Sequence, residues 1–420
     1  MADFKVFDLG DFSLQSGVTL RNAFIAYKTH GDPSNPAIVY PTWYSGLISE
    51  NEWLIGEDKT LSPKKYFIII PALFGNSEST SPSNTPEPRP FPSVTMLDNV
   101  TAQHRLVTEE LGVTHLKAVL GWSMGAAQTY QWITQYPDFV DLAVPFCGAA
   151  KCSLHNQVFL EGVKTALIGA KGAVSAGISK LEATDASQYR NWTAKEREVG
   201  LKALGRVYAG WGFSQAFYRE KVYETHLGFK DLDDCMVGFW EAWALSKDPE
   251  NMVTMLDTWQ SADCSNQDRY KGDFGLAMKS IKAKTLVLPS KTDLYFPPED
   301  SEIEVAHMSP GIGKCIAFPS IWGHWAGGPG QSKEDVKWLD EKLKVFFESG
   351  SLDDKLIKAV HAMAKSSLGL EIPAFGAPAA LEAVALGATR IELNAKGSYG
   401  EGGLTPSLED LKTKPSSIIT

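Results

Sequence analysis

The sequence predicts an α/β fold built on a mostly parallel, doubly wound sheet, and three observations lead to this prediction. Two short, almost fully apolar runs at residues 37–40 and 66–70 are typical of strands buried on both faces of a parallel sheet. Strand and helix patterns then alternate between residues 96 and 146. The strand pattern returns near residue 285, after a long helical segment, so that segment is predicted to be an insertion.

The chain opens with a pattern typical of an antiparallel hairpin. Apolar and polar residues alternate from Phe12, the Ser-Gly pair at residues 16–17 predicts the turn, and a second alternating run follows at residues 23–29. Residues 75–93 are rich in Ser, Pro and Asn, which predicts a loop without regular structure.

The centre of the predicted sheet comes from the alternating part of the chain. Apolar residues at helical spacing predict a helix over residues 96–111, which should end at Gly112. A strand is expected at 117–120, a helix at 126–135 and another strand at 140–146.

Residues 153–280 have a different character, because they are mostly helical in pattern and rich in large aromatic side chains. We expect them to form a helical cap inserted into a sheet domain that comprises residues 1–152 and 281–350. The tryptophans of this segment are better explained as core than as ligand platforms, because a small helical layer needs bulky residues to bury area. They include Trp192, Trp211, Trp240, Trp243 and Trp259.

Two late strands and a helix complete the sheet domain, at residues 285–288, 314–318 and 334–348. Residues 351–420 are predicted to be a linker followed by a partial C-terminal βαβ extension. Its strands are expected at 368–372 and 390–393.

The composition is that of a globular protein without a nucleic-acid or membrane partner. Hydrophobic residues make up 44% and charged residues 21%, which is enough for a large core. The net charge of −10 disfavours non-specific nucleic-acid binding, which needs a basic surface. No run approaches the length of a membrane span, and the start lacks the pattern of a secretory signal. The five scattered cysteines predict reduced, mostly buried thiols and, with these features, a cytoplasmic location.

The pattern Gly-Trp-Ser-Met-Gly at residues 121–125 lies between a predicted strand and a predicted helix. In this setting Gly-x-Ser-x-Gly is the nucleophile elbow of the α/β-hydrolase fold, a tight turn that places the serine hydroxyl at the end of the sheet. Gly121 and Gly125 fit this turn, because neighbouring backbones come too close for side chains. Ser123 is therefore the predicted nucleophile, and a purely structural turn is the alternative.

A serine nucleophile needs a base, and the base needs an acid that orients it. In this fold the three follow in the order Ser, Asp or Glu, then His, each after a strand. Asp293 and His324 follow the two late strands and are the predicted acid and base. The rivals that fit less well are Asp300, which is too far past its strand, and His115 and His155, which follow no late strand.

The oxyanion hole should use the backbone N–H of Met124, directly after the nucleophile. A second N–H is expected from the loop after the strand at 37–40, at Thr42 or Trp43. No metal-ligand spacing or Gly-rich phosphate loop is recognisable in the hydrolase part, so neither a metal nor a bound cofactor is expected. The expected partner is a small ester, thioester or alcohol.

Several segments together resemble the homoserine O-acetyltransferase family of α/β hydrolases, over about residues 12–347. They lie at residues 25–31, 71–77, 123–125, 136–140, 292–298 and 323–324. The resemblance implies acyl transfer from a thioester, such as acetyl-CoA, to an alcohol through an acyl-serine. It also implies the roles given above for Ser123, Asp293 and His324, and it allows a homodimer formed through the cap.

The sequence departs from that family's pattern in two places. The family's elbow usually has glycine where Trp122 and Ala126 stand, which makes Trp122 a candidate substrate-binding residue. Two cap arginines that hold an amino-acid carboxylate in the family have no counterpart at residues 213–215 and 246–248. Arg206 is retained and is a second candidate. Without bidentate arginine clamps, we expect no strong preference for homoserine.

The tail resembles the start of the CutC copper-homeostasis family, a TIM barrel, at residues 370–372, 387–393 and 401–407. Only the first strand, helix and second strand are represented, whereas a closed barrel needs eight such units. We therefore expect a truncated fragment without a copper role.

These observations predict serine-dependent acyl transfer on a small molecule other than homoserine, by ester hydrolysis or by O-acyl transfer from a thioester. Two alternatives remain, an authentic homoserine O-acetyltransferase that uses acetyl-CoA and a hydrolase fold used only for binding. The complete set of three catalytic residue types disfavours the last, because binding alone does not require them.

Overall fold

The computed structural model describes residues 3–86, 90–172, 191–327 and 329–350. Contacts within the chain divide it into two units, Met1–Glu341 and Lys342–Thr420. The predicted C-terminal extension, with its resemblance to the copper-homeostasis family, lies outside the described residues.

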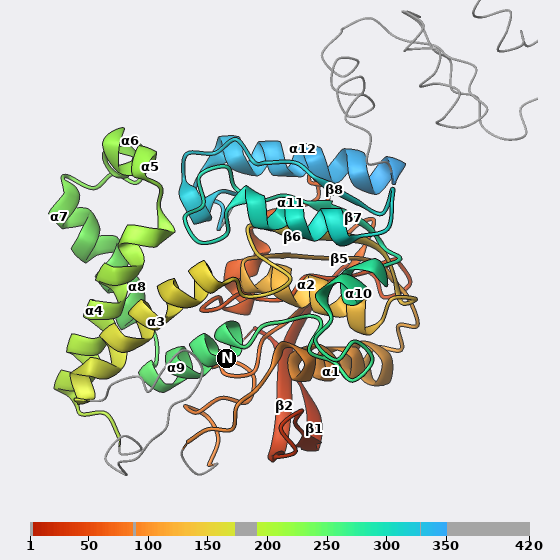
Figure 1. The fold of residues 1–420 in the computed structure, drawn as a ribbon, viewed down its shortest axis with the longest axis horizontal. Helices are drawn as coiled ribbons and strands as arrows, with labels where there is room; N and C mark the ends of the chain where they lie inside the picture. Colours follow the sequence, from red (N-terminus) through yellow and green to blue (C-terminus); the bar gives the residue numbers. More distant parts are fainter. Residues whose placement is uncertain (1–2, 87–89, 173–190, 328, 351–420) are drawn as a thin grey trace, which may run out of the picture. The chain divides into compact units, whose positions relative to one another are not determined.

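Eight strands form one mostly parallel sheet in the order β1-β2-β4-β3-β5-β6-β7-β8 (Figure 1). β1 (Lys5–Ser13) and β2 (Thr19–His30) form the predicted hairpin, and β2 pairs antiparallel with β4 (Phe67–Pro71). The other strands run parallel, as the apolar runs predict. They are β3 (Ala37–Val39), β5 (Leu116–Trp122), β6 (Val140–Phe146), β7 (Lys284–Val287) and β8 (Gly313–Cys315).

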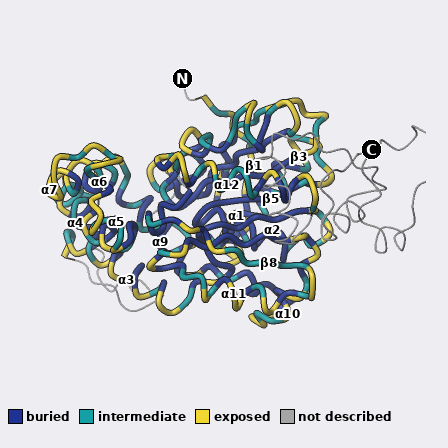
Figure 2. The backbone as a smooth tube through the Cα atoms, turned by 90° about the horizontal axis from the view of Figure 1, so that it is seen from above, coloured by how far each residue is buried: buried dark blue, intermediate teal, exposed yellow. Residues whose placement is uncertain are grey.

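Burial explains the composition of these strands. Every residue of β3 and β4 is buried, and β5 and β6 each have a single residue that is not. A strand covered on both faces gains most from aliphatic side chains, which is why these segments are nearly continuous in hydrophobicity. Figure 2 shows mostly buried backbone along β5 and the adjoining helix α2 (Met124–Gln135).

The helix predicted over residues 96–111 is present in two parts. α1 (Met96–Arg105) begins with a capping box, in which Thr95 and Asp98 each accept a backbone N–H from the other. Residues Leu106–Glu110 continue it as a π-helical turn. The described part of the Ser/Pro/Asn-rich loop contains no helix or strand, as predicted.

The described part of residues 153–280 is mainly helical, with turns and loops between the helices, and Figure 1 shows α3, α4, α7 and α8 gathered beside the sheet. The helices are α3 (Leu154–Ile168), α4 (Ala194–Gly212), α5 (Gln215–Arg219), α6 (Val222–Thr225), α7 (Leu232–Cys235), α8 (Ala242–Leu245), α9 (Pro249–Gln260) and α10 (Phe274–Lys279). A π-helical segment, Met236–Glu241, joins α7 to α8. Short 3-10 helices span Ile48–Leu54, Gly169–Lys171 and Gly323–Trp325, while α11 (Pro298–His307) and α12 (Lys333–Ser349) follow the late strands.

The end of the helical segment packs with the sheet rather than with the other cap helices. Cys264, Tyr270 and Met278 belong to the same hydrophobic cluster as the residues of β5 and α2. The Tyr270 hydroxyl also donates to the carbonyl oxygen of Thr134 in α2, at 2.7 Å. The division into core and cap stays a prediction, and these contacts favour a cap that ends before residue 264.

All five cysteines are free thiols, and four of them are buried, which confirms the prediction made for them. None of the described helices has the length and apolar character needed to cross a bilayer.

A buried carboxyl group joins α11 to α2. Glu304 accepts the Tyr130 hydroxyl at 2.6 Å and the backbone N–H of Ala150 at 2.6 Å. Burial raises the pKa of Glu304 from 4.5 to about 8, against the opposing effect of these two donors. The folded chain therefore keeps this group protonated at pH values where the unfolded chain has lost the proton.

This difference predicts a specific pH dependence of stability. A raised folded-state pKa means that the contribution of Glu304 is fully present below about pH 4.5 and is lost as the pH rises to about 8. Glu304→Gln removes this titration, so the variant should not lose stability in this way as the pH rises. The melting temperature of the variant minus that of wild type should therefore increase from pH 5 to pH 8. The effect is at most about 1.4 kcal/mol per pH unit. The exposed Glu302→Gln on the same helix is the control, and a Glu304→Gln curve parallel to wild type would contradict the prediction.

Candidate active site

The nucleophile elbow lies where the sequence predicts it, between β5 and α2. Ser123 directly precedes the first residue of α2, and its backbone has a φ of 59° and a ψ of −123°. A positive φ is strained for a residue other than glycine, and such strain is concentrated at functional sites. The Ser123 N–H donates to the carbonyl oxygen of Phe146 at 3.1 Å, which fixes the turn to the neighbouring strand.

Close backbone contacts explain the glycines of the motif. A Cβ at Gly121 would lie 2.3 Å from the carbonyl group of Gly125, and a Cβ at Gly125 would lie 3.1 Å from the carbonyl oxygen of Pro41. A Cβ at Gly148 would lie 2.4 Å from the carbonyl oxygen of Ser123. Nothing in the local sequence marks Gly148 for this role, because the role depends on β6 ending beside the elbow.

The three predicted catalytic side chains form a continuous hydrogen-bonded line. His324 Nε2 lies 2.8 Å from Ser123 Oγ, and His324 Nδ1 lies 2.7 Å from Asp293 Oδ2. The exposed fractions are 2% for Ser123, 5% for Asp293 and 1% for His324, so the line is almost closed to solvent. Asp293 Oδ1 accepts the backbone N–H groups of Tyr295 and Phe296 at 3.0 Å each. These bonds aim the other carboxylate oxygen at the imidazole.

The rival residues lie elsewhere. Asp300 is in the first turn of α11. It is not the partner of His324, because Asp293 and Ser123 already contact the two ring nitrogens of that histidine. His115 is half exposed and pairs with Asp141 at 2.8 Å. His155 is exposed at the start of α3.

The backbone donors expected for an oxyanion hole differ in their availability. Met124 is the first residue of α2, so its N–H has no acceptor within the helix. The N–H of Thr42 is occupied, because it donates to the carbonyl oxygen of Pro71 at 3.1 Å. Across the described chain, no hydrogen-bond acceptor faces the N–H of Trp43. Met124 and Trp43 therefore stay the predicted donors, and Thr42 is the weaker alternative.

A buried carboxyl group holds the loop that carries His324. Asp335 Oδ2 accepts the Ser320 hydroxyl at 2.6 Å and lies 3.4 Å from the Gly327 nitrogen, one contact on each side of the histidine. Burial raises the pKa of Asp335. No sequence pattern marks Asp335, because its contacts depend on how the loop folds back on the start of α12.

A cavity of about 210 Å³ opens on Ser123 and His324. Its lining is mainly aromatic and comes from both the sheet domain and the predicted cap. The aromatic lining residues are Trp43, Tyr44, Trp122, Tyr208, Phe239, Trp243 and Trp325. The core interpretation of the cap tryptophans holds for Trp240 and Trp259, which are buried, whereas Trp243 faces the cavity.

The two candidate substrate-binding residues differ in position. Trp122 lines the cavity beside Ser123. Arg206 is half exposed and does not belong to the lining, and its Nε donates to Glu241 at 2.6 Å. The ion pair accounts for Arg206 without a substrate, so we leave it out of the candidate site.

The described lining of the cavity carries one carboxylate. Glu50 is part of the described lining, which includes no lysine or arginine. The ammonium of Lys247 reaches the edge of the cavity, where it donates to the carbonyl oxygen of Ser45 at 2.9 Å and lies 3.8 Å from Glu50. The lysine is thus already engaged by groups of the protein.

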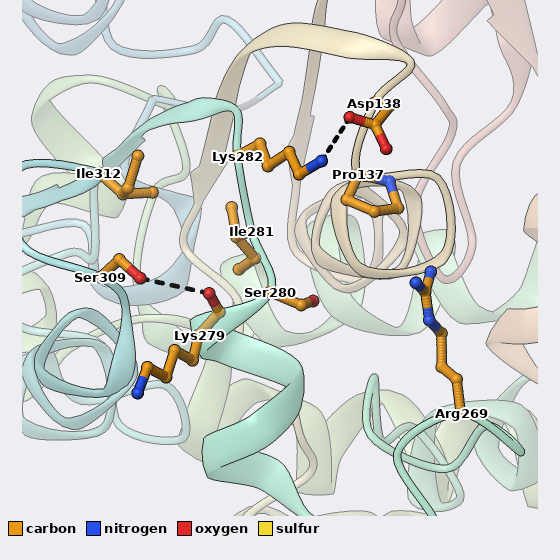
Figure 3. Close-up of a pocket in the computed structure, with 9 residues that line it drawn as sticks. All are labelled: Pro137, Asp138, Arg269, Lys279, Ser280, Ile281, Lys282, Ser309 and Ile312. Atoms are coloured by element: carbon orange, nitrogen blue, oxygen red, sulfur yellow. Dashed lines mark hydrogen bonds and ion pairs between the residues drawn. The ribbon is translucent and has the colours of Figure 1, made fainter.

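A second cavity, of about 500 Å³, lies at the opposite ends of β6 and β7, where these strands begin (Figure 3). Lys282 Nζ donates to Asp138 at 2.6 Å across its rim. Its lining contains no histidine or cysteine, and its serines have no neighbouring base. Its chemistry therefore does not match the acyl transfer that the sequence predicts. Within the described ranges, no three His, Cys, Asp or Glu side chains are grouped so that they could hold a metal ion.

Comparison with known proteins agrees with the fold. The family described as the alpha/beta hydrolase fold matches residues 44–326, more than half of the chain. The chain belongs to the α/β-hydrolase family. The predicted fold class is therefore confirmed.

Relatives in this family include proteins named as ester hydrolases. A probable esterase of Corynebacterium glutamicum is 34% identical over 82% of this chain and 96% of its own length. An ethyl acetate hydrolase of Pseudomonas veronii is 36% identical over 71% of this chain and 82% of its own length. The crystal structure of an acetylester hydrolase from Corynebacterium glutamicum superposes with a TM-score of 0.74 at 32% identity, covering 82% of this chain and 96% of that one.

The resemblance to homoserine O-acetyltransferases is also reflected among the relatives. The enzyme of that name from Zymomonas mobilis is 25% identical over 74% of this chain and 88% of its own length. The chain thus shares a family with both groups, and its identity to the esterase and to the ethyl acetate hydrolase is higher than to the Zymomonas mobilis enzyme.

Proposed function

We propose that this chain is a serine esterase that hydrolyses small, uncharged acyl esters through an acyl-Ser123 intermediate. The observation that carries the proposal is the Ser123–His324–Asp293 line opening on a small aromatic cavity. The relatives named as an esterase and as an ethyl acetate hydrolase support the same reaction class.

Acylation begins when Ser123 Oγ attacks the ester carbonyl carbon and His324 Nε2 takes the hydroxyl proton. Asp293 accepts a hydrogen bond from Nδ1, which keeps Nε2 unprotonated beforehand and stabilises the imidazolium afterwards. The carbonyl oxygen becomes an oxyanion that receives the N–H groups of Met124 and Trp43. The intermediate then collapses, and the bond to the leaving oxygen breaks. That oxygen takes the proton from His324, so that the alcohol leaves and the acyl-serine remains.

Deacylation repeats these steps with water as the nucleophile. His324 removes a proton from the water, the acyl–Oγ bond breaks, and Ser123 regains its proton as the acid leaves. The cavity of about 210 Å³ is smaller than the roughly 300–1,000 Å³ usual for ligand pockets, which favours small acyl esters.

The charge of the cavity argues for a neutral substrate. A free carboxylate in a substrate would need a cationic partner, and the described lining offers none. Lys247 is held by Ser45 and Glu50. An amino acid such as homoserine therefore lacks the charged contacts that would select it.

The proposal predicts a clear preference in a direct comparison. We expect kcat/KM for ethyl acetate or 4-nitrophenyl acetate to exceed that for homoserine with acetyl-CoA by about 10²–10⁴. This range corresponds to two missing hydrogen bonds to a charged group. Steady-state kinetics with both substrate pairs would measure it. A homoserine KM well below millimolar, with turnover equal to that of the esters, would instead indicate a homoserine O-acetyltransferase.

The acyl acceptor is tested with a panel of acyl esters and thioesters, with and without alcohols, and products identified by mass. Free acid as the main product supports an esterase, and a new ester as the main product indicates an acyltransferase. No turnover on any member, together with no fluorophosphonate label on Ser123, would favour a binding role. The homodimer through the cap and the cytoplasmic location stay predictions.

A further inference from the structure

Trp122 contacts the segments of the proposed base and of the proposed oxyanion donor. Its ring stacks on the imidazole of His324, with centroids 4.8 Å apart and planes 24° apart. Its indole N–H donates to the backbone carbonyl oxygen of His324 at 3.1 Å. Its ring also meets the edge of Trp43, the proposed oxyanion donor, at 4.9 Å and 76°. Because Trp122 directly precedes Ser123, one residue touches the nucleophile, base and oxyanion segments.

The backbone of Trp122 is well suited to such a role. It is the last residue of β5, where it pairs with Phe146 of β6. Its side chain is 2% exposed and is held on a further side by Trp325, at 5.7 Å and 79°. The ring is therefore anchored in the central sheet, whereas Trp43 lies in a loop and His324 in a short 3-10 helix.

The Trp122 ring can limit tilting of the His324 imidazole. The bond to Asp293 fixes one end of the imidazole, about which the ring could still tilt. The rings of Tyr295 and Phe296 contact the imidazole at 39° and 44°, whereas Trp122 lies closest to parallel with it, at 24°. A tilt that moves Nε2 by about 1 Å from Ser123 can cost about 10²-fold in rate. Contact between two flat rings opposes the tilt, and the indole N–H holds the backbone of the same residue.

We propose that Trp122 is a positioning residue that holds His324 and Trp43 in place relative to Ser123. The inference rests on the proposed function, since it assigns Trp122 a role in that reaction. It goes beyond the substrate contact expected for Trp122, because positioning His324 and Trp43 requires no contact with substrate. A purely space-filling role would give Trp122 an effect on stability without a matching effect on rate.

The test compares two tryptophans. Trp122→Phe keeps an aromatic ring and loses the N–H donor, and Trp122→Leu loses both. Trp132 provides the matched control, because it is buried, its N–H donates to Gln103 at 2.8 Å, and it does not line the cavity. We expect kcat to fall by about 10-fold in Trp122→Phe and about 10²-fold in Trp122→Leu, with KM changed by less than about threefold. Trp132→Phe and Trp132→Leu should keep kcat within about twofold of wild type.

A second readout separates this inference from the proposed function. The rate at which a fluorophosphonate modifies Ser123 depends on the serine–histidine contact and should fall in parallel with kcat. If wild type is labelled at Ser123 but the Trp122 variants react and turn over like the Trp132 variants, Trp122 is only a core residue. If wild type is not labelled at Ser123, the proposed function fails instead. Should Trp122→Leu not fold, Trp122→Phe alone decides between these outcomes.

Discussion

Ser123→Ala should abolish ester turnover and leave the fold intact. We expect kcat to fall by about 10⁴–10⁶, the range associated with removal of a nucleophilic serine. The reason is chemical, because no other hydroxyl lies within hydrogen-bond distance of His324 Nε2 in the described structure. Alanine keeps the Cβ and the positive φ of the elbow, so the melting temperature should change little. Steady-state kinetics and thermal unfolding of the same preparation would measure both effects.

The control for this variant is a buried serine away from the cavity. Ser62 is 1% exposed, and its hydroxyl donates to the carbonyl oxygen of Glu57 at 3.3 Å. Ser62→Ala should keep wild-type turnover and should still be labelled by a fluorophosphonate at Ser123. Activity of Ser123→Ala within tenfold of wild type, or a label on a different serine of the wild-type chain, would show that the nucleophile has been misassigned.

Asp293→Asn should reduce kcat by about 10⁴ without loss of fold, as expected when the histidine is held in the wrong tautomer. The structure explains why the wrong tautomer would form. Oδ1 of Asp293 accepts two backbone N–H groups, so the oxygen of asparagine should occupy that position. The amide nitrogen would then face His324 Nδ1 and donate to it. Nδ1 would become the acceptor, and the proton would sit on Nε2, where the base is needed.

Asp300→Asn is the matched control, because Asp300 is the rival acid that the sequence offers after the same strand. Its turnover should stay within about twofold of wild type, since it lies in α11 away from the imidazole. The pair is best measured at several pH values, so that a shifted optimum is not mistaken for lost activity. A loss of less than tenfold in Asp293→Asn, combined with a large loss in Asp300→Asn, would reverse the assignment.

Much of the sheet and the catalytic line could be predicted from the sequence because their signals are local. Buried parallel strands are continuous in hydrophobicity, and the elbow needs glycines at fixed spacing around Ser123. Asp293 and His324 were recognisable from their order and from the strands that precede them. All three residues lie together in the structure as expected from that reasoning.

The parts that were not predictable depend on contacts between distant segments. Thr42 and Trp43 look equivalent in sequence, and only the bond from Thr42 to Pro71 separates them. Asp335 contacts Ser320 and Gly327 on the loop that carries His324. Gly148 lies against the carbonyl oxygen of Ser123. Neither contact is between neighbours in the sequence. The packing of Tyr270 on α2 was not predictable either, because it joins a turn near residue 270 to a helix more than a hundred residues earlier in the chain.

The separate origins of the reacting groups and of the cavity wall bear on how such an enzyme changes over evolutionary time. Ser123, Asp293 and His324 all follow strands of the sheet, whereas Tyr208 and Trp243 come from α4 and α8 of the predicted cap. Mutations in the helices can therefore alter which molecules are accepted while the acyl-transfer chemistry is inherited unchanged. Directed evolution toward a new ester would do best to vary these helices first and to leave the strand-end loops alone.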